Sequence, residues 1–255
     1  MNITSYSREQ IEDGIKQARE RNDGPNGHIR LLFAPERINS DNFERTCDIY
    51  SRVDMANYET VVIIESHHEE LNKKLSMPSN KIFETPLGQV PANDYIRNEF
   101  CDEDDDFFIH DEAFNKNASL FQQLMFLQTL SDDFSAVHIQ IADRDPSIVK
   151  ELAYVVEEVL ASRNALIIFC CELDNEHKKE FQDIKKMVET NNQSGLLNHL
   201  NSNSSPMKGA TSFMAGVIVA NQWNLTLNFL NGEYQDYSGS LLTAYGEPER
   251  LGFEV

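Results

Sequence analysis

Short apolar runs alternate with longer amphipathic segments along this chain. β-Branched and aliphatic residues run together without alternation in four places, which predicts strands over residues 29–34, 60–64, 136–141 and 165–170. Continuous apolar character is typical of strands that are covered on both faces. Helical spacing and end signals, including a proline in the first turn of the fourth segment, predict helices over residues 8–22, 41–53, 117–130, 146–161 and 175–190.

The remaining segments are shorter or more polar. Residues 81–83 are predicted to form a short strand, and the acidic run 102–106 a solvated loop. The Asn- and Ser-rich stretch 191–206 is expected to be a mobile surface segment with one short helix around residues 196–200. A buried helix is predicted over 213–221, and two further strands over 225–230 and 240–245.

This alternation of strands and helices predicts an α/β fold with three layers, α/β/α, around a central mixed sheet. We expect residues 1–255 to form a single domain, with residues 1–28 as a divergent N-terminal helix. In such sheets, functional groups collect just beyond the carboxyl ends of the strands. That rule selects three segments, 34–37, 65–68 and 171–175.

Charge and cysteine usage narrow the range of partners. Acidic residues (42) outnumber basic ones (22), so the formal charge is −20, which disfavours nucleic acid and anionic membrane surfaces as partners. The apolar runs are too short to span a membrane, and the first residues lack the layout of a signal peptide. Cys170 and Cys171 are expected to be buried thiols on opposite faces of a strand, and a reducing cytoplasm is predicted.

Three side chains at the strand ends are candidates for chemistry. His67 would ligate a metal or act as a general base, and Glu36 and Glu172 would complete a mixed carboxylate–imidazole site or work as an acid/base pair. The alternative is structural: a polar surface histidine, and solvated carboxylates near helix N-termini. Because the sequence contains no P-loop, GxGxxG, HExxH or GxSxG motif, nothing in it names a reaction.

An ordered series of segments resembles the MEMO family, also called protein B of the AmmeMemoRadiSam system. The resemblance runs from about residue 29 to the C-terminus. The most specific match is Thr85-Pro86-Leu87-Gly88-Gln89-Val90-Pro91, which reproduces a family segment. The others are Leu32-Phe33-Ala34-Pro35-Glu36-Arg37, Ile64-Glu65-Ser66-His67, the helix start over 118–128, Cys170-Cys171-Glu172-Leu173-Asp174-Asn175, and Lys208-Gly209.

The resemblance implies a fold similar to class III extradiol dioxygenases, with a cleft in which two histidines and a cysteine bind copper or iron. Position by position, only His67 retains the identity of a metal ligand, because Glu36 and Lys208 stand where the family has a histidine and the cysteine. Other cleft positions also differ from the family, namely Ala118, Phe121, Glu172 and Asn175.

These differences favour a divergent member without a redox metal. A protonated lysine repels a cation, and Lys208 would instead pair with Glu36 or Glu172, so no cofactor is expected. If any metal binds, it would be a single divalent ion such as zinc or manganese, held by His67 with Glu36 and Glu172.

Three functions stay open. The leading hypothesis is a pseudoenzyme: a non-catalytic binding or scaffold module whose cleft, with Asn175 as a further candidate, recognises a protein, a peptide or a small polar ligand. The rival is a re-tooled enzyme, hydrolytic or isomerising, that uses Glu36 or Glu172 as base, His67 as acid, base or ligand, and Lys208 as an electrophilic clamp. A third hypothesis is a structural partner protein that docks through an acidic surface.

Overall fold

A mixed sheet forms the centre of the protein. The structure, a computed structural model, describes residues 6–21, 28–67, 73–111, 114, 119–143, 145–173, 177–202, 205–229 and 242–245. Within these residues, eight strands form one sheet in the order β6-β3-β7-β2-β8-β1-β10-β9. Their bounds are β1 Ile29–Ala34, β2 Thr60–Ser66, β3 Leu75–Met77, β6 Phe107–Ile109, β7 Ser135–Ile141, β8 Ala165–Cys170, β9 Thr226–Phe229 and β10 Leu242–Tyr245.

The four strands at the middle of the sheet, β7, β2, β8 and β1, run parallel to one another. Antiparallel neighbours flank them, β3 beside β7 and β10 beside β1. Both faces of the middle strands are buried, as their continuous apolar character predicted: every residue of β1 and of β8 is buried. Chain order and strand order differ here, because β2 lies between β7 and β8.

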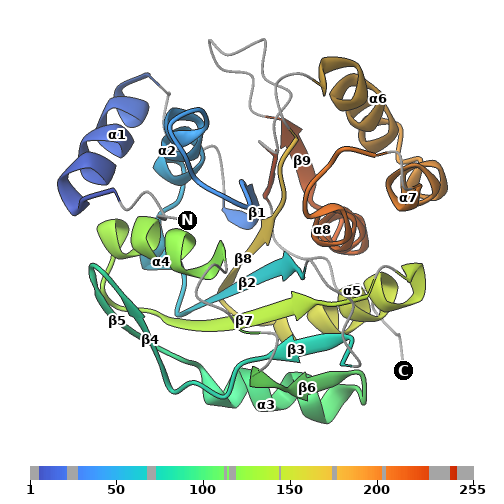
Figure 1. Cartoon of the computed structure of the whole chain (residues 1–255), viewed down its shortest axis with the longest axis horizontal. Helices are drawn as coiled ribbons and strands as arrows, with labels where there is room; N and C mark the ends of the chain where they lie inside the picture. Colours follow the sequence, from blue (N-terminus) through green and yellow to red (C-terminus); the bar gives the residue numbers. More distant parts are fainter. Residues whose placement is uncertain are drawn as a thin grey trace.

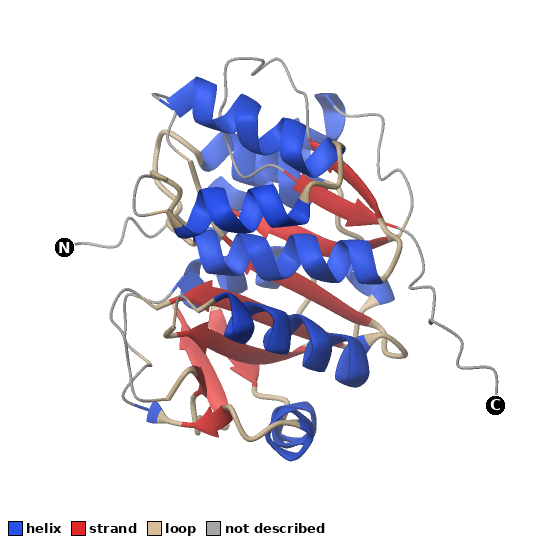
Figure 2. Cartoon of the chain, turned by 90° about the vertical axis from the view of Figure 1, so that its right-hand side faces the viewer, coloured by secondary structure: helices blue, strands red, loops and turns tan. Residues whose placement is uncertain are grey.

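Helices cover both faces and complete the three layers. The helices α1 (Arg8–Arg21), α2 (Phe43–Ser51) and α4 (Ser119–Leu130) share one core with one face of the sheet and lie together on the left of Figure 1. The other face packs against α3, α5, α6, α7 and α8, several of which cross in front of the strands in Figure 2. Their bounds are Asp94–Glu103, Pro146–Leu160, Lys178–Glu189, Gln193–Asn201 and Ala210–Gln222. The predicted α/β/α class is therefore confirmed.

Alternation along each strand assigns its side chains to one core or the other. Val61 and Ile63 of β2 pack with α1, α2 and α4, whereas Val62 and Ile64 pack with α5 and α8. Cys170 and Cys171 separate in the same way, which confirms the prediction that they are buried on opposite faces. All four cysteines of the chain are free thiols.

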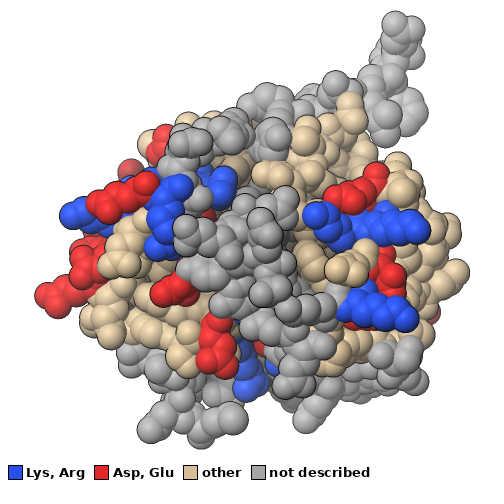
Figure 3. Space-filling view, turned by 90° about the horizontal axis from the view of Figure 1, so that it is seen from above, with Lys and Arg blue, Asp and Glu red and all other residues tan. Residues whose placement is uncertain are grey.

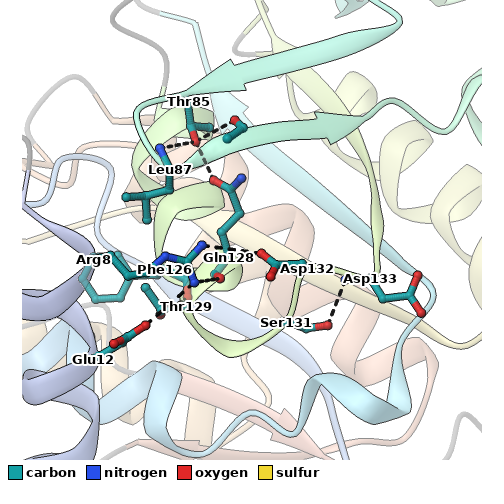
Figure 4. A network of polar contacts seen from close by, with 11 residues as sticks. Arg8, Glu12, Thr85, Leu87, Phe126, Gln128, Thr129, Ser131, Asp132 and Asp133 are labelled. Atoms are coloured by element: carbon teal, nitrogen blue, oxygen red, sulfur yellow. Dashed lines mark hydrogen bonds and ion pairs between the residues drawn. The ribbon is translucent and has the colours of Figure 1, made fainter.

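The Thr-Pro-Leu-Gly segment makes a hairpin turn. It joins β4 (Ile82–Thr85) to β5 (Gly88–Pro91), and Gly88 adopts a φ of +136° that other residues rarely take. The Thr85 hydroxyl lies 2.5 Å from Gln128 Oε1 of α4 and accepts a hydrogen bond of 3.1 Å from the Leu87 N–H (Figure 4). The segment therefore fastens the hairpin to the last turns of α4.

The same end of α4 also contacts the first helix. Arg8 Nη1 donates to the carbonyl oxygen of Gln128 at 3.1 Å, and its Nη2 lies 3.5 Å from Asp132, as Figure 4 shows. Arg8 therefore connects α1 to α4 in the layer that covers this face of the sheet. The N-terminal helix, expected to be divergent, is thus an integral part of this layer.

Several predicted boundaries are wrong. The helix α2 is shorter than the predicted 41–53, and the acidic run 102–106 begins inside α3, whose Asn93 side chain caps the helix by accepting from Ile96 N. Five elements were not predicted. The strands β3, β5 and β6 and the 3₁₀ helix η1 (Met55–Asn57) are too short to show a period, and α3 buries only Ile96, Arg97 and Phe100, which make a weak apolar pattern. In the Asn- and Ser-rich stretch, α7 is longer than expected, and Leu196 and Leu200 anchor it.

Candidate functional site

Acidic and polar side chains line one face of the sheet where the middle strands end. Glu65 of β2 is in register with Gln140 of β7 and with Cys170 of β8. Side chains point alternately to the two faces of a strand, so these three residues lie on the same face as Ile63, which is the face that α4 covers. Neighbouring strands are about 4.8 Å apart, so these side chains lie next to one another across the sheet.

Glu65 forms the floor of this site and is 3% exposed. Its Oε2 accepts a hydrogen bond of 2.6 Å from the backbone N–H of Ser119, the first residue of α4. Its Oε1 lies 2.8 Å from His138 Nε2 and 2.7 Å from Gln140 Nε2. Burial alone would raise the pKa of Glu65, but His138 and the three hydrogen bonds lower it to about 2. The floor therefore carries a fixed negative charge.

Glu172 and Lys208 face each other at the mouth of the site. Lys208 Nζ donates to Glu172 Oε1 at 2.8 Å, and the two backbones exchange hydrogen bonds of 3.0 and 2.9 Å. The other carboxylate oxygen of Glu172 accepts from the N–H of Arg37 at 3.3 Å. This carboxylate is thus held by a cation and by the backbone of a neighbouring strand end.

Glu36 lies between these groups and is 4% exposed. Burial, followed by the negative charges of Glu65 and Glu172, raises the pKa of its carboxyl to about 7, although the positive charges of Arg37 and Lys208 oppose this shift. These interactions place Glu36, Glu65, Glu172 and Lys208 in one electrostatic cluster, which we call the carboxylate cluster.

The start of α8 is clamped against the ends of the strands. Gly209 has a φ of +67°, and a Cβ atom there would lie 2.3 Å from the carbonyl oxygen of Cys170. Ser66 Oγ lies 2.5 Å from Thr211 Oγ1, and Ser212 Oγ donates to the carbonyl oxygen of Ile64 at 2.9 Å. Only glycine permits so close an approach in this conformation, which brings the preceding lysine to the cluster.

The structure brings together three of the five predicted cleft residues, Glu36, Glu172 and Lys208. The backbone N–H of His67 donates to the carbonyl oxygen of Ile141 at 2.8 Å and so continues the ladder of β2. The side chain of His67 is half-buried, and its proposed role stays a prediction. Asn175 lies outside the described residues, as does Ala118.

The floor of the site was not predicted. Glu65 lies in the selected segment 65–68, of which only His67 was a candidate, and Ser119, His138 and Gln140 were not among the candidates. The sequence did contain a signal. Glu65 directly follows the apolar run 60–64, and His138 and Gln140 interrupt the apolar run 136–141. Polar groups in such positions need buried partners, and these residues are one another's partners.

The donor set does not fit a copper or iron ion. Among the described residues, no group of three histidine, cysteine, aspartate or glutamate side chains is arranged to hold a metal ion. Cys170 is in register with Glu65, and burial and the neighbouring charges of Glu65, Cys171 and Glu36 raise its pKa well above the usual value. The ammonium of Lys208, at the position where the family has a cysteine, repels a cation and cannot coordinate one.

The surface charge is mixed where it can be seen. On the face shown in Figure 3, lysine and arginine side chains lie beside aspartate and glutamate side chains. Exposed pairs elsewhere include Lys74 with Asp106 at 3.7 Å and Lys185 with Glu189 at 3.7 Å. This face therefore does not offer an uninterrupted acidic surface to a basic partner.

The raised pKa of Glu36 predicts a pH-dependent effect on stability. Its ordinary pKa is 4.5 and its folded pKa is about 7, so its contribution to stability is full below pH 4.5 and is lost as the pH rises through 7. The loss amounts to about 3 kcal/mol at most. Because Glu36→Gln is neutral at every pH, we expect this variant to gain stability relative to the unmodified protein between about pH 5 and pH 8.

Urea unfolding of the variant and of the unmodified protein at about pH 5 and about pH 8 measures this effect. The matched control is Glu189→Gln, which changes a carboxylate that is 56% exposed and lies on α6. An equal change for the two variants between the two pH values would contradict the environment that the structure gives Glu36.

The fold and the site together define a three-layer α/β protein with a polar site at the carboxyl ends of its middle strands. A family model described as "Memo-like protein" matches residues 5–237, and the chain belongs to this family. The match begins before residue 29, where the sequence resemblance was expected to start, and so includes α1.

Two relatives from other organisms agree with this assignment. A MEMO1 family protein of Thermotoga neapolitana is 34% identical over 131 residues, which are 49% of this chain and 46% of that protein. One of Aquifex aeolicus is 25% identical over 135 residues, 51% and 48% of the two chains. The chain thus aligns with about half the length of these relatives.

The crystal structure of uncharacterized protein JW3007 from Escherichia coli K12 has the same fold, with a TM-score of 0.57 and 13% identity over 85% of this chain and 98% of that one. Within the described part of the chain, no helix is both long enough and apolar enough to cross a membrane.

Proposed function

We propose that this Memo-like chain is a non-catalytic binding module whose cleft is held together by internal ion pairs instead of a metal ion. The observation that carries the proposal is the pairing of Lys208 Nζ with Glu172 Oε1 at 2.8 Å, reinforced by two backbone hydrogen bonds between the same residues. A metal at this position would have to displace an ammonium that the backbone holds in place.

The charges of the other carboxylates also support a role in binding. Glu65 is fully engaged with Ser119, His138 and Gln140, and its low pKa makes it a poor base at neutral pH. Carboxylates that several partners hold in place fix the shape of the cleft and its electrostatic potential. A protein, a peptide or a small polar ligand that enters the cleft would be recognised by that potential, and a cytoplasmic location stays a prediction.

Metal analysis tests the proposal. We expect the purified protein to carry copper and iron only in trace amounts, and zinc and manganese to bind weakly in calorimetry. Lys208→Ala removes the resident ammonium and leaves Glu172 unpaired, so this variant should bind zinc at least about tenfold more tightly. The matched control is Lys81→Ala, which breaks the exposed pair of Lys81 with Asp94 near the start of β7, at the opposite end of the strand.

Two outcomes would overturn the proposal. One is a stoichiometric copper or iron ion that His67→Ala releases from the native protein. The other is unchanged zinc affinity in a folded Lys208→Ala variant.

One observation favours a second candidate, the re-tooled enzyme. The pKa of Glu36 is raised to about 7, which suits a general acid or base at neutral pH. In that case a hydrolytic screen would find turnover that Glu36→Gln abolishes without loss of thermal stability. We expect such a screen to find none.

A further inference from the structure

The strand β9 forms one edge of the sheet. In the described part of the chain, β9 pairs with β10 along one side, and the strand order ends there, without a strand on its other side. Alternate residues direct their N–H and C=O groups to the same side of a strand, so about half of the four residues Thr226–Phe229 have groups that point away from β10. Such an edge is a template on which another strand can pair.

A hollow of about 410 Å³ lies against this strand, and we call it the β9 groove. It is lined by Leu227, Asn228 and Phe229, by side chains of α6, and by Asn221 of α8. Leu227 and Phe229 point to one face of the sheet and Asn228 to the other, so a hollow that borders all three reaches the backbone of β9. Phe181 of α6 holds the Phe229 ring in an edge-on contact, with 5.7 Å between the ring centroids.

The charges around the β9 groove balance. Lys185 and Glu189 of α6 lie 3.7 Å apart and are 29% and 56% exposed. The other polar side chains of the lining are carboxamides, which both donate and accept hydrogen bonds, namely Asn191, Asn221 and Asn228. The whole chain carries a formal charge of −20, so two copies repel each other over most of their surface. A patch without net charge is where this repulsion is smallest.

The β9 groove is also complementary to itself, which a two-fold axis between two copies requires. An edge strand supplies both donors and acceptors, and carboxamides pair with carboxamides. Antiparallel pairing of two β9 strands also reverses α6, which brings Lys185 toward Glu189 of the partner subunit. A purely basic or purely acidic peptide would leave one of these two charges unmatched, whereas a second copy matches both.

We infer that β9 is a docking edge for a second copy of this chain, with the two β9 strands antiparallel across a two-fold axis and the two sheets continuous. The inference goes beyond the proposed function, because β10 and β1 separate β9 from β8, whose end carries Glu172 of the cleft. Four residues offer few hydrogen bonds, so we expect a dissociation constant on the order of 10–100 µM and a mainly monomeric protein at low micromolar concentration.

Sedimentation equilibrium of the full chain between about 1 and about 300 µM measures the association. We expect a monomer at the lower concentration and a dimer at the higher one. Hydrogen exchange locates the contact: exchange of the outward backbone N–H groups within residues 226–229 should slow at least about threefold over this range. Exchange in β6, at the other end of the strand order, should not change.

Reversed charges test the arrangement of the two copies. Lys185→Glu and Glu189→Lys each place like charges across the axis, and each should weaken association at least about tenfold. An equimolar mixture of the two variants restores opposite charges between unlike copies and should regain the association. The matched control is Lys74→Glu, which reverses an exposed charge beside β3, far from β9 in the strand order, and should leave association unchanged.

The inference is overturned if the chain stays monomeric at about 300 µM, or if it dimerises without slower exchange in residues 226–229. It is also overturned if the mixture of folded variants associates no better than either variant alone; if a variant is unfolded in a thermal melt, the exchange result decides. A monomer that binds a peptide of alternating threonine and valine along β9 would assign the edge to a foreign strand and would equally exclude the second copy.

Discussion

Replacing Glu65 by alanine is expected to lower the free energy of unfolding by about 3–5 kcal/mol, the usual cost of removing one partner from a buried ionic network. The carboxylate accepts hydrogen bonds from Ser119, His138 and Gln140, and none of these donors is near water. Without it, the first N–H of α4, an imidazole and an amide lose their acceptor in the core. Urea unfolding at neutral pH measures the change.

The control is Glu12→Ala, which removes a carboxylate that is 48% exposed on α1 and should change stability by less than about 1 kcal/mol. Equal losses for the two variants would show that the Glu65 network is absent in solution.

The acid limb of the stability curve provides an independent test of the same network. The pKa of Glu65 is lowered from 4.5 to about 2, so its contribution is complete above pH 4.5 and is lost as the pH falls toward 2. We therefore expect the stability of Glu65→Ala to depend less on pH in this range than that of the unmodified protein. An identical acid limb in both proteins would contradict the lowered pKa.

Replacing Gly209 by alanine is expected to cost about 3 kcal/mol or more. The residue has a φ of +67°, where side chains are disfavoured, and the added Cβ would lie 2.3 Å from the carbonyl oxygen of Cys170 and 2.9 Å from Cys171 Cα. Both contacts are with backbone of the strand end, which cannot move without disturbing β8. If the start of α8 moved away from the strand end to relieve these contacts, Lys208 would separate from Glu172, so the variant should also lose the ion pair of the cleft.

Thermal and urea unfolding measure this loss, with Gly195→Ala in α7 as the control. There the three atoms nearest to the added Cβ belong to the side chain of Asn192, which caps α7 by accepting from Gly195 N at 3.0 Å, so displacing it would cost a helix cap, about 1 kcal/mol. A smaller loss is therefore expected at Gly195. If alanine at position 209 were as well tolerated as alanine at position 195, the close approach of α8 to β8 would be wrong.

Much of the fold could be predicted from local patterns. The bounds of β1 and β8 agree with the apolar runs 29–34 and 165–170, because a strand buried on both faces must be apolar throughout. The rule that functional groups follow strand ends selected Glu36 and Glu172, and the structure brings these two carboxylates into one cluster because their strands β1 and β8 are neighbours in the sheet. The short elements β3 and β6 had no such signal, since three residues cannot display a period.

The sequence by itself determined the layers of this protein and the residues that stand at its strand ends, since burial on two faces and helical periodicity are written into consecutive residues. Only the tertiary structure decided which of those residues meet. Glu65 and its partner His138 are 73 residues apart, and they touch because β2 lies beside β7, an order that no local pattern encodes. The unexpected floor of the site is a product of that order, because side chains on neighbouring strands become partners only when register and face both agree.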